Sequence, residues 1–333
     1  MNASRARQCL RRVWTIRPIH LIDAPAADST FSKRHRFVFS KLRALELPFK
    51  KLVFLDLDVW LRRNPSELFQ ISAPAGMHHG TWSFFHKPAH GEHWPSEAYH
   101  NSCVNAGLMR LDPPKNSSTQ VVDMVEEVQT IRERDASALP EQYYLVGRLK
   151  DWHHINVTWN CEVFQCLYAN KCTSSKQWGT SAWSDLPKAW WGLGRSKRDL
   201  RENVNMFHFS GTYLKPWWYL YLLNSHTLQD SEAIIDSEFY ERDRRGLIGL
   251  AVREWLEGVT AVQQEFANCT KLNHFIGGVI SSLAKDALLW RQHCPHCQKH
   301  VWELWGSPWS KKTEDEQAFG TCCEECAIRL CWQ

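Results

Sequence analysis

The sequence lacks any long run of apolar residues. Its best candidates, Trp217–Leu223 and Leu247–Val252, are far shorter than the roughly 18 residues that a membrane-spanning helix needs. It also lacks a large excess of either charge, because 40 basic and 36 acidic side chains leave a net charge of +4. A net charge this small does not indicate nucleic-acid binding. The sequence therefore predicts neither a transmembrane segment nor a nucleic-acid partner.

Glycine and proline are scarce, and no internal repeat is present. The chain has 16 glycines and 14 prolines among 333 residues, whereas apolar residues make up 44% and charged residues 23%. This composition excludes disordered, collagen-like and low-complexity chains. The length allows a sizeable core, so we expect one large globular domain with smaller appendages.

Cysteine is sparse until the C-terminal tail, where six of the 12 cysteines lie in the last forty residues. Two C-x-x-C pairs, Cys294 with Cys297 and Cys323 with Cys326, offer the four thiolates of a tetrahedral Zn²⁺ site. Four N-x-S/T sequons leave open a disulfide-rich tail of a secreted protein. Because the chain carries no secretory signal, we expect a structural zinc module and favour the cytoplasm over the Golgi lumen.

Short buried strands and amphipathic helices alternate along the first two thirds of the chain. Apolar and β-branched runs predict strands at residues 13–22, 51–56, 103–111 and 203–209. Apolar stripes at helical spacing predict helices at residues 31–48, 118–134 and, with interruptions at Gly246 and Gly258, 228–292. This alternation is typical of an α/β fold with a largely parallel sheet.

Two aspartates end the most hydrophobic of these strands. Asp56 and Asp58 flank Leu57, and residues i and i+2 of an extended chain project to the same side, so both carboxylates can reach one cation. The carboxyl ends of strands in open α/β sheets are ligand-binding positions. A haloacid dehalogenase-like phosphatase would need threonine where this chain has Trp60. A solvated pair of aspartates remains the simpler interpretation unless other motifs accompany the pair.

Four motifs in a fixed order do accompany it. They are F-L-D-L-D-V-W-L-R-R-N-P-S-E-L-F, N-A-G-L-M-R-L-D-P, P-E-Q-Y-Y-L-V-G-R-L and H-F-S-G-T-Y-L-K-P-W. In this order, over residues 31–220, the chain resembles glycosyltransferase family 8, the glycogenin-like retaining sugar transferases. The resemblance implies the GT-A fold, a Rossmann-like mixed sheet flanked by helices. The resemblance implies metal-dependent transfer of a hexose from a UDP-sugar to an external carbohydrate or protein acceptor.

The resemblance also implies the roles of individual residues. The metal ligands are Asp56, Asp58 and His208, and the imidazole shifts the preference from Mg²⁺ toward Mn²⁺. The donor-binding residues are Lys41, Leu57, Asn105, Ala106, Gly107, Gly211 and Lys215. Glu141 and Gln142 are the catalytic pair at a helix start, where the family has Asp-Gln. The extra methylene of Glu141 displaces its carboxylate by about an ångström, and such a shift can cost about 10²-fold in rate.

The N-terminal side departs from the family, whose members have a longer stretch before the D-x-D motif. Only 55 residues precede Asp56 here, so we expect the first β-α unit to be missing. We expect a transferase domain at residues 1–225, a helical segment at 226–292 and the cysteine-rich module at 293–333. The alternative function is an inactive binding module whose zinc tail recruits a partner.

Two further expectations concern the acceptor. Residues 78–100 link the D-x-D segment to the N-A-G strand, and we expect them to form an acceptor-side loop that carries Trp82 and Trp94. Glycogenin carries its acceptor tyrosine before the H-F-x-G strand, but no tyrosine lies between Tyr168 and Tyr213. We therefore expect no self-glucosylation.

Overall fold

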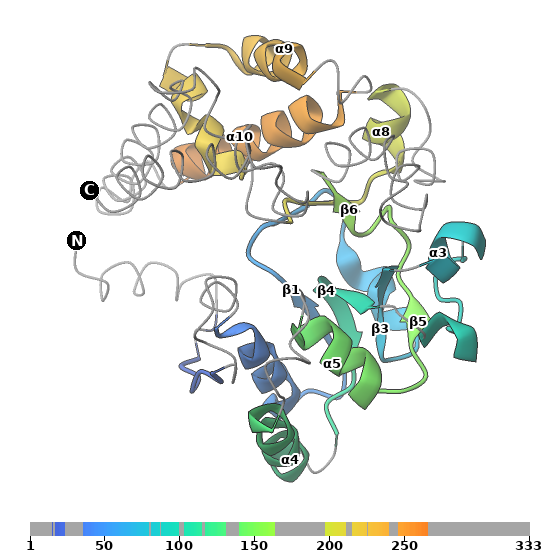
Figure 1. The fold of residues 1–333 in the computed structure, drawn as a ribbon. Coiled ribbons are helices and arrows are strands. Elements are labelled where there is room, and N and C mark those ends of the chain that lie inside the picture. Colours follow the sequence, from blue (N-terminus) through green and yellow to red (C-terminus); the bar gives the residue numbers. More distant parts are fainter. Residues whose placement is uncertain are drawn as a thin grey trace, which may run out of the picture. The chain divides into compact units, whose positions relative to one another are not determined.

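The computed structural model describes residues 15, 17–23, 36–79, 81–86, 88–99, 103–114, 117–130, 140–163, 197–210, 215–224, 226–239 and 246–265 (Figure 1). They fall into two compact units, one within Ile16–Ser210 and one that includes the described residues from 215 onward. Within these ranges, no helix has the length and apolar character to cross a membrane. The expected domain boundaries after residues 225 and 292 stay predictions.

Two small sheets form the centre of the first unit. The larger has the order β1 (Leu52–Leu55), β4 (Cys103–Leu111), β3 (Ala75–His79) and β5 (His153–His154). The smaller has the order β2 (Val59–Leu61), β7 (Met206–His208) and β6 (Cys161–Glu162). Central strand β4 is buried along its whole length, because cores lie on both of its faces.

The direction of the strands corrects the prediction of a largely parallel sheet. Among the described residues, three of the five strand pairings are antiparallel, β1 with β4, β3 with β4, and β2 with β7. A largely apolar segment such as β4 is typical of a parallel strand covered on both faces. A central antiparallel strand that is also covered on both faces produces the same pattern, so burial alone could not fix the direction. The mixed sheets with flanking helices confirm the α/β class.

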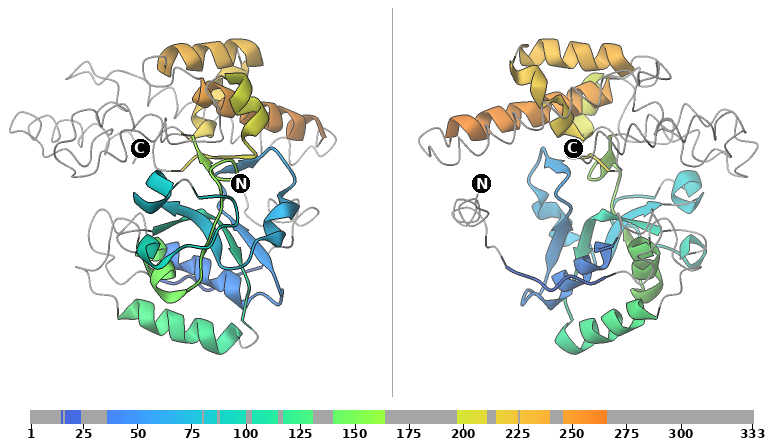
Figure 2. Two further views of the ribbon diagram at one scale, coloured as in Figure 1. Left: turned by 90° about the vertical axis from the view of Figure 1, so that its right-hand side faces the viewer. Right: turned by 60° about the vertical axis from the view of Figure 1, so that its left-hand side comes forward.

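Helices cover one face of the larger sheet (Figure 2). These are η1 (Val38–Glu46), α4 (Ser117–Gln129) and α5 (Pro140–Arg148). Their apolar stripes supply Leu42, Val121 and Leu145 to a core shared with Val104 and Ala106 of β4. The shorter helices of this unit are η2 (Pro65–Gln70), α3 (Thr81–His86), η3 (Ser96–Tyr99) and α8 (Lys197–Asn203).

Most predicted elements of the first unit are confirmed. The strands at 51–56, 103–111 and 203–209 correspond to β1, β4 and β7, and the helix at 118–134 corresponds to α4. The helix at 31–48 is confirmed as the 3₁₀ helix η1 from residue 38 onward. The strand expected at 13–22 is wrong where it is described, since residues 15 and 17–22 have no regular structure.

The segment 78–100 is not a plain loop. It contains α3 and η3, and its Trp82 and Trp94 are 6% and 0% exposed. Both indole rings contact the buried His78, at centroid separations of 5.0 and 4.5 Å. The expectation that these two tryptophans face an acceptor is therefore wrong, because their rings fill the core.

The second unit is helical, with η6 (Pro216–Asn224), α9 (Leu228–Phe239) and α10 (Leu247–Glu265). Gly249 lets α10 approach α9, because an added Cβ would lie 2.1 Å from Asp236 Oδ1. Arg253 of α10 pairs with Glu232 of α9 at 2.7 Å. The helical prediction is confirmed for the described residues from 228 to 265, although α10 continues through Gly258.

Candidate metal and donor site

The D-x-D segment passes from the larger sheet to the smaller one. The N–H of Asp56 donates to the carbonyl of Gly107 at 2.9 Å, which extends the pairing of β1 with β4. The carbonyl of Asp58 accepts from the N–H of Phe209 at 2.8 Å, where β2 begins to pair with β7. The two carboxylates therefore lie at the junction of the two sheets.

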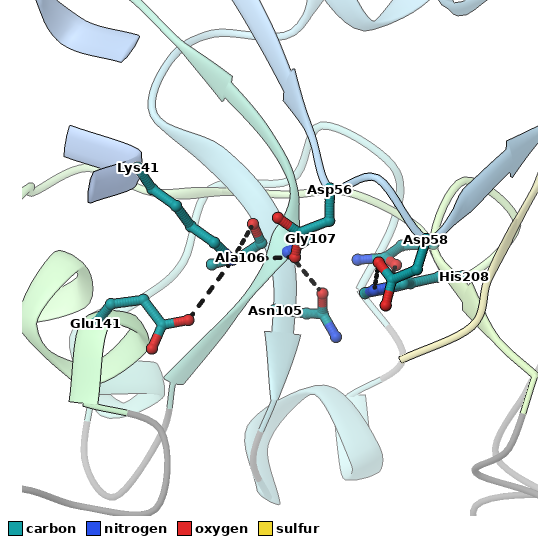
Figure 3. A network of polar contacts seen from close by, with 9 residues as sticks. Lys41, Asp56, Asp58, Asn105, Ala106, Gly107, Glu141 and His208 are labelled. Atoms are coloured by element: carbon teal, nitrogen blue, oxygen red, sulfur yellow. Dashed lines mark hydrogen bonds and ion pairs between the residues drawn. The ribbon is translucent and has the colours of Figure 1, made fainter. Parts of the chain in front are cut away.

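Three predicted metal ligands converge at this junction (Figure 3). Asp56, Asp58 and His208 each offer one ligand atom, and these atoms lie within 4.8 Å of one another. His208 Nε2 lies 3.5 Å from Asp58 Oδ1. Two carboxylates and one imidazole suit a divalent cation such as Mn²⁺, so the donor set fits the metal that the resemblance implied.

Two neighbours fix the ring of His208, which is itself buried. Its Nδ1 lies 2.8 Å from Oδ1 of the buried Asn160. One of its edges packs against Gly107, where an added Cβ would lie 2.2 Å from His208 Cε1. Glycine is therefore required at position 107 by the imidazole, and this reason differs from the donor contact that we expected there.

Lys41 connects the aspartates to the predicted catalytic pair. Its Nζ lies 3.0 Å from Asp56 Oδ2 and 3.6 Å from Glu141 Oε1, and it donates to the carbonyl of Ala106 at 3.3 Å. Figure 3 shows this lysine reaching between the two carboxylates. One ammonium group thus offsets the repulsion between two partly or fully buried acids.

Glu141 and Gln142 lie in the first turn of α5. Glu141 is 4% exposed, and its Oε2 has no hydrogen-bond partner in the described part of the protein. The same holds for Gln142 Oε1. A buried acceptor without a donor is costly, and such a group commonly indicates a position where a ligand supplies the donor.

The remaining predicted donor-binding residues differ in how the structure places them. Asn105 is buried, and its Oδ1 accepts from the N–H of Gly107 at 3.0 Å. Leu57 extends its side chain fully into solvent between the two aspartates. Lys215 lies in the second unit, with Nζ 5.8 Å from the centre of the Trp217 ring. Gly211 and the four cysteines of the predicted zinc site lie outside the described residues.

Sequence reasoning missed two arginines that support the site. Arg62 donates to the carbonyls of Val204 at 2.5 Å and Arg201 at 2.8 Å, and Arg63 donates to the carbonyl of Glu202. These carbonyls lie at the end of α8 and just beyond it, where helical partners are missing. Because β7 follows directly, the two arginines help to place His208. Their position after the D-x-D strand was the only sequence signal.

Comparisons with known proteins address the family to which this chain belongs. Residues 24–220 match the family described as glycosyl transferase family 8. An uncharacterised protein of Acanthamoeba polyphaga mimivirus is 31% identical over 225 residues, which cover 63% of this chain and 66% of the viral protein. The crystal structure of the galactosyltransferase LgtC in complex with donor and acceptor sugar analogues aligns with 55% of this chain and 62% of its own, at 16% identity and a TM-score of 0.30. Since the family match spans more than half of the chain, this protein is a member of glycosyl transferase family 8.

Proposed function

We propose that this glycosyltransferase is a retaining, metal-dependent hexosyltransferase that uses a UDP-sugar and an external acceptor. The observation that carries the proposal is the convergence of Asp56, Asp58 and His208 beside the ammonium group of Lys41. A sugar leaves its donor together with a developing negative charge on the diphosphate. A divalent cation held by the triad would neutralise that charge, as a Lewis acid does.

The protein's own residues then have distinct tasks. Lys41 holds Asp56 and Glu141 in place through its single ammonium group. The free Oε2 of Glu141 and Oε1 of Gln142 are acceptors for hydroxyl groups of the donor sugar. Lys215 and the backbone at Gly211 would contribute further contacts to the diphosphate, as the family resemblance implies. In this proposal the sugar binds near Glu141 and Gln142 of α5, and the diphosphate binds near Asp56 and Asp58.

The first test is the effect of Mn²⁺ on nucleotide affinity. We expect Mn²⁺ to tighten UDP binding at least about tenfold relative to chelator, which is about 1.4 kcal/mol. Asp58→Ala should abolish the difference, because it removes a ligand atom from the triad. Isothermal titration calorimetry of the full chain measures both affinities.

Asp123→Ala is the matched control, since Asp123 is an exposed aspartate on α4. It should leave the Mn²⁺ effect intact. Equal UDP affinity of the wild-type protein with Mn²⁺ and with chelator would contradict the metal assignment. Metal-dependent hydrolysis of a UDP-sugar, followed by nucleotide chromatography, separates an active transferase from an inactive binding module.

The second test concerns the acceptor. Because no tyrosine lies between Tyr168 and Tyr213, we expect no sugar to be attached to the protein itself. Intact mass and peptide mapping after incubation with donor and Mn²⁺ alone should show an unmodified chain. A hexose on any tyrosine would overturn the assignment of an external acceptor.

The third test concerns the tail. We propose that Cys294, Cys297, Cys323 and Cys326 hold one structural zinc ion, on the evidence of their spacing alone. Elemental analysis of the full chain should give about one equivalent of zinc, which the double variant Cys294→Ser/Cys297→Ser should lose. Detection of these cysteines as disulfides by peptide mapping would instead support the secreted alternative.

A further inference from the structure

Asn160 is a fully buried polar residue next to the site and has no role among the expected ligands. Its Oδ1 faces His208 Nδ1 at 2.8 Å. An amide oxygen only accepts hydrogen bonds, so this contact is a hydrogen bond in the tautomer of His208 that carries its proton on Nδ1. The other ring nitrogen, Nε2, is the atom that faces Asp58, at 3.5 Å.

The backbone around Asn160 is tied to the strand that carries His208. The carbonyl of Thr158 accepts from the N–H groups of Asn205 and Met206, at 2.7 and 3.2 Å. Directly after Asn160, β6 pairs in parallel with β7, with Cys161 opposite Phe207. The backbone segments that carry Asn160 and His208 therefore belong to one hydrogen-bonded frame.

We propose that Asn160 is a positioning residue that holds His208 in the Nδ1-protonated tautomer and so keeps the Nε2 lone pair directed at the metal position. This inference rests on the proposed metal-dependent function. Without Asn160, the buried Nδ1–H would have no acceptor, and the ring could rotate or change tautomer to satisfy it. Loss of such a partner typically weakens metal binding by about 10- to 100-fold.

The main experiment measures Mn²⁺ affinity of the full chain by electron paramagnetic resonance of the free ion, without any donor. Asn160→Leu has a similar volume and no acceptor, and it should weaken Mn²⁺ binding by about 10- to 100-fold. Asn160→Asp keeps an acceptor oxygen and should remain within a few-fold of wild type. In the His208→Ala background, Asn160→Leu should cause no further loss, because Asn160 acts through His208.

Two outcomes of this experiment would overturn the proposal. One is an unchanged Mn²⁺ affinity of a folded Asn160→Leu variant. The other is an equal additional loss in the His208→Ala background, because a residue that only supports the fold would weaken binding with or without the imidazole.

A second measurement needs neither the variant nor the metal. Nitrogen-15 resonances of the His208 ring in metal-free wild-type protein should show a protonated Nδ1 and an unprotonated Nε2 at pH 8. The reverse tautomer would overturn the proposal even if Asn160→Leu fails to fold. If wild-type protein shows this tautomer but no Mn²⁺ binding, the metal-dependent function is wrong and the positioning of the ring stands.

Discussion

Gly107→Ala is expected to lower kcat/KM for sugar transfer by on the order of 10²-fold, because the added methyl group occupies the position of the His208 ring. The Cβ would lie 2.2 Å from His208 Cε1 and 2.7 Å from Nε2. The ring is buried and its Nδ1 contacts Asn160 Oδ1, so it cannot rotate away from the methyl group without losing this hydrogen bond. The imidazole must therefore shift by about an ångström, which is enough to disturb the geometry of three ligands around one cation.

Gly147→Ala is the matched control for this substitution. Gly147 lies in α5, and an alanine Cβ at this position meets no atom within 4 Å. Its helical position should make the alanine variant more stable by about 0.5–1 kcal/mol, with unchanged transfer kinetics. Steady-state kinetics give kcat/KM of both variants, and titration with Mn²⁺ gives their affinities for the metal. Normal Mn²⁺ affinity of Gly107→Ala would show that the ring tolerates the methyl group.

Trp94→Ala is expected to reduce the free energy of unfolding by about 3–5 kcal/mol, the usual cost of removing a large aromatic side chain from a core. Trp94 is 0% exposed and contacts three other aromatic rings besides His78, those of Trp152, Tyr99 and Trp82. Trp152 is stacked on it at a centroid separation of 5.6 Å. Urea denaturation followed by circular dichroism measures the loss.

Trp94→Phe tests whether packing is the cause. Trp94 Nε1 is buried without a hydrogen-bond partner among the described residues, so phenylalanine removes a polar group that was not satisfied. We expect less than half of the destabilisation of the alanine variant. A stable Trp94→Ala protein with a raised acceptor KM would restore the earlier expectation that this ring contacts the acceptor.

The convergence of Asp56, Asp58 and His208 could be predicted because the three residues lie in short motifs with local meaning. Asp56 and Asp58 are two residues apart at a strand end, and His208 opens a motif of its own. Asn160 and Arg62 could not be predicted in the same way. Their partners lie 48 and up to 142 residues away along the chain, so neither the position of Arg62 after the D-x-D strand nor the local sequence around Asn160 identifies the groups that they contact. Hydrogen-bond partners of this kind depend on the tertiary fold.

The secondary structure likewise divides into elements that the local sequence predicts and features that depend on tertiary contacts. A largely apolar run identified β4, which is buried along its whole length, and apolar residues at helical spacing identified α4, which is buried on one face. Strand direction depends on which neighbours β4 meets, and β4 lies between β1 and β3 in antiparallel order. In the segment 78–100, two helices of only six and four residues are too short to show a helical period.

The position of the D-x-D segment between two sheets has a thermodynamic consequence. Asp56 is bonded to the sheet of β1 and β4, whereas Asp58 and His208 belong to the sheet of β2 and β7. A cation that binds all three side chains cross-links the sheets, and at 100 times its dissociation constant it stabilises the native state by about 2.7 kcal/mol. On the proposed metal-dependent function, a chelator would break this cross-link, so the melting temperature and the nucleotide affinity should fall together when the metal is withdrawn.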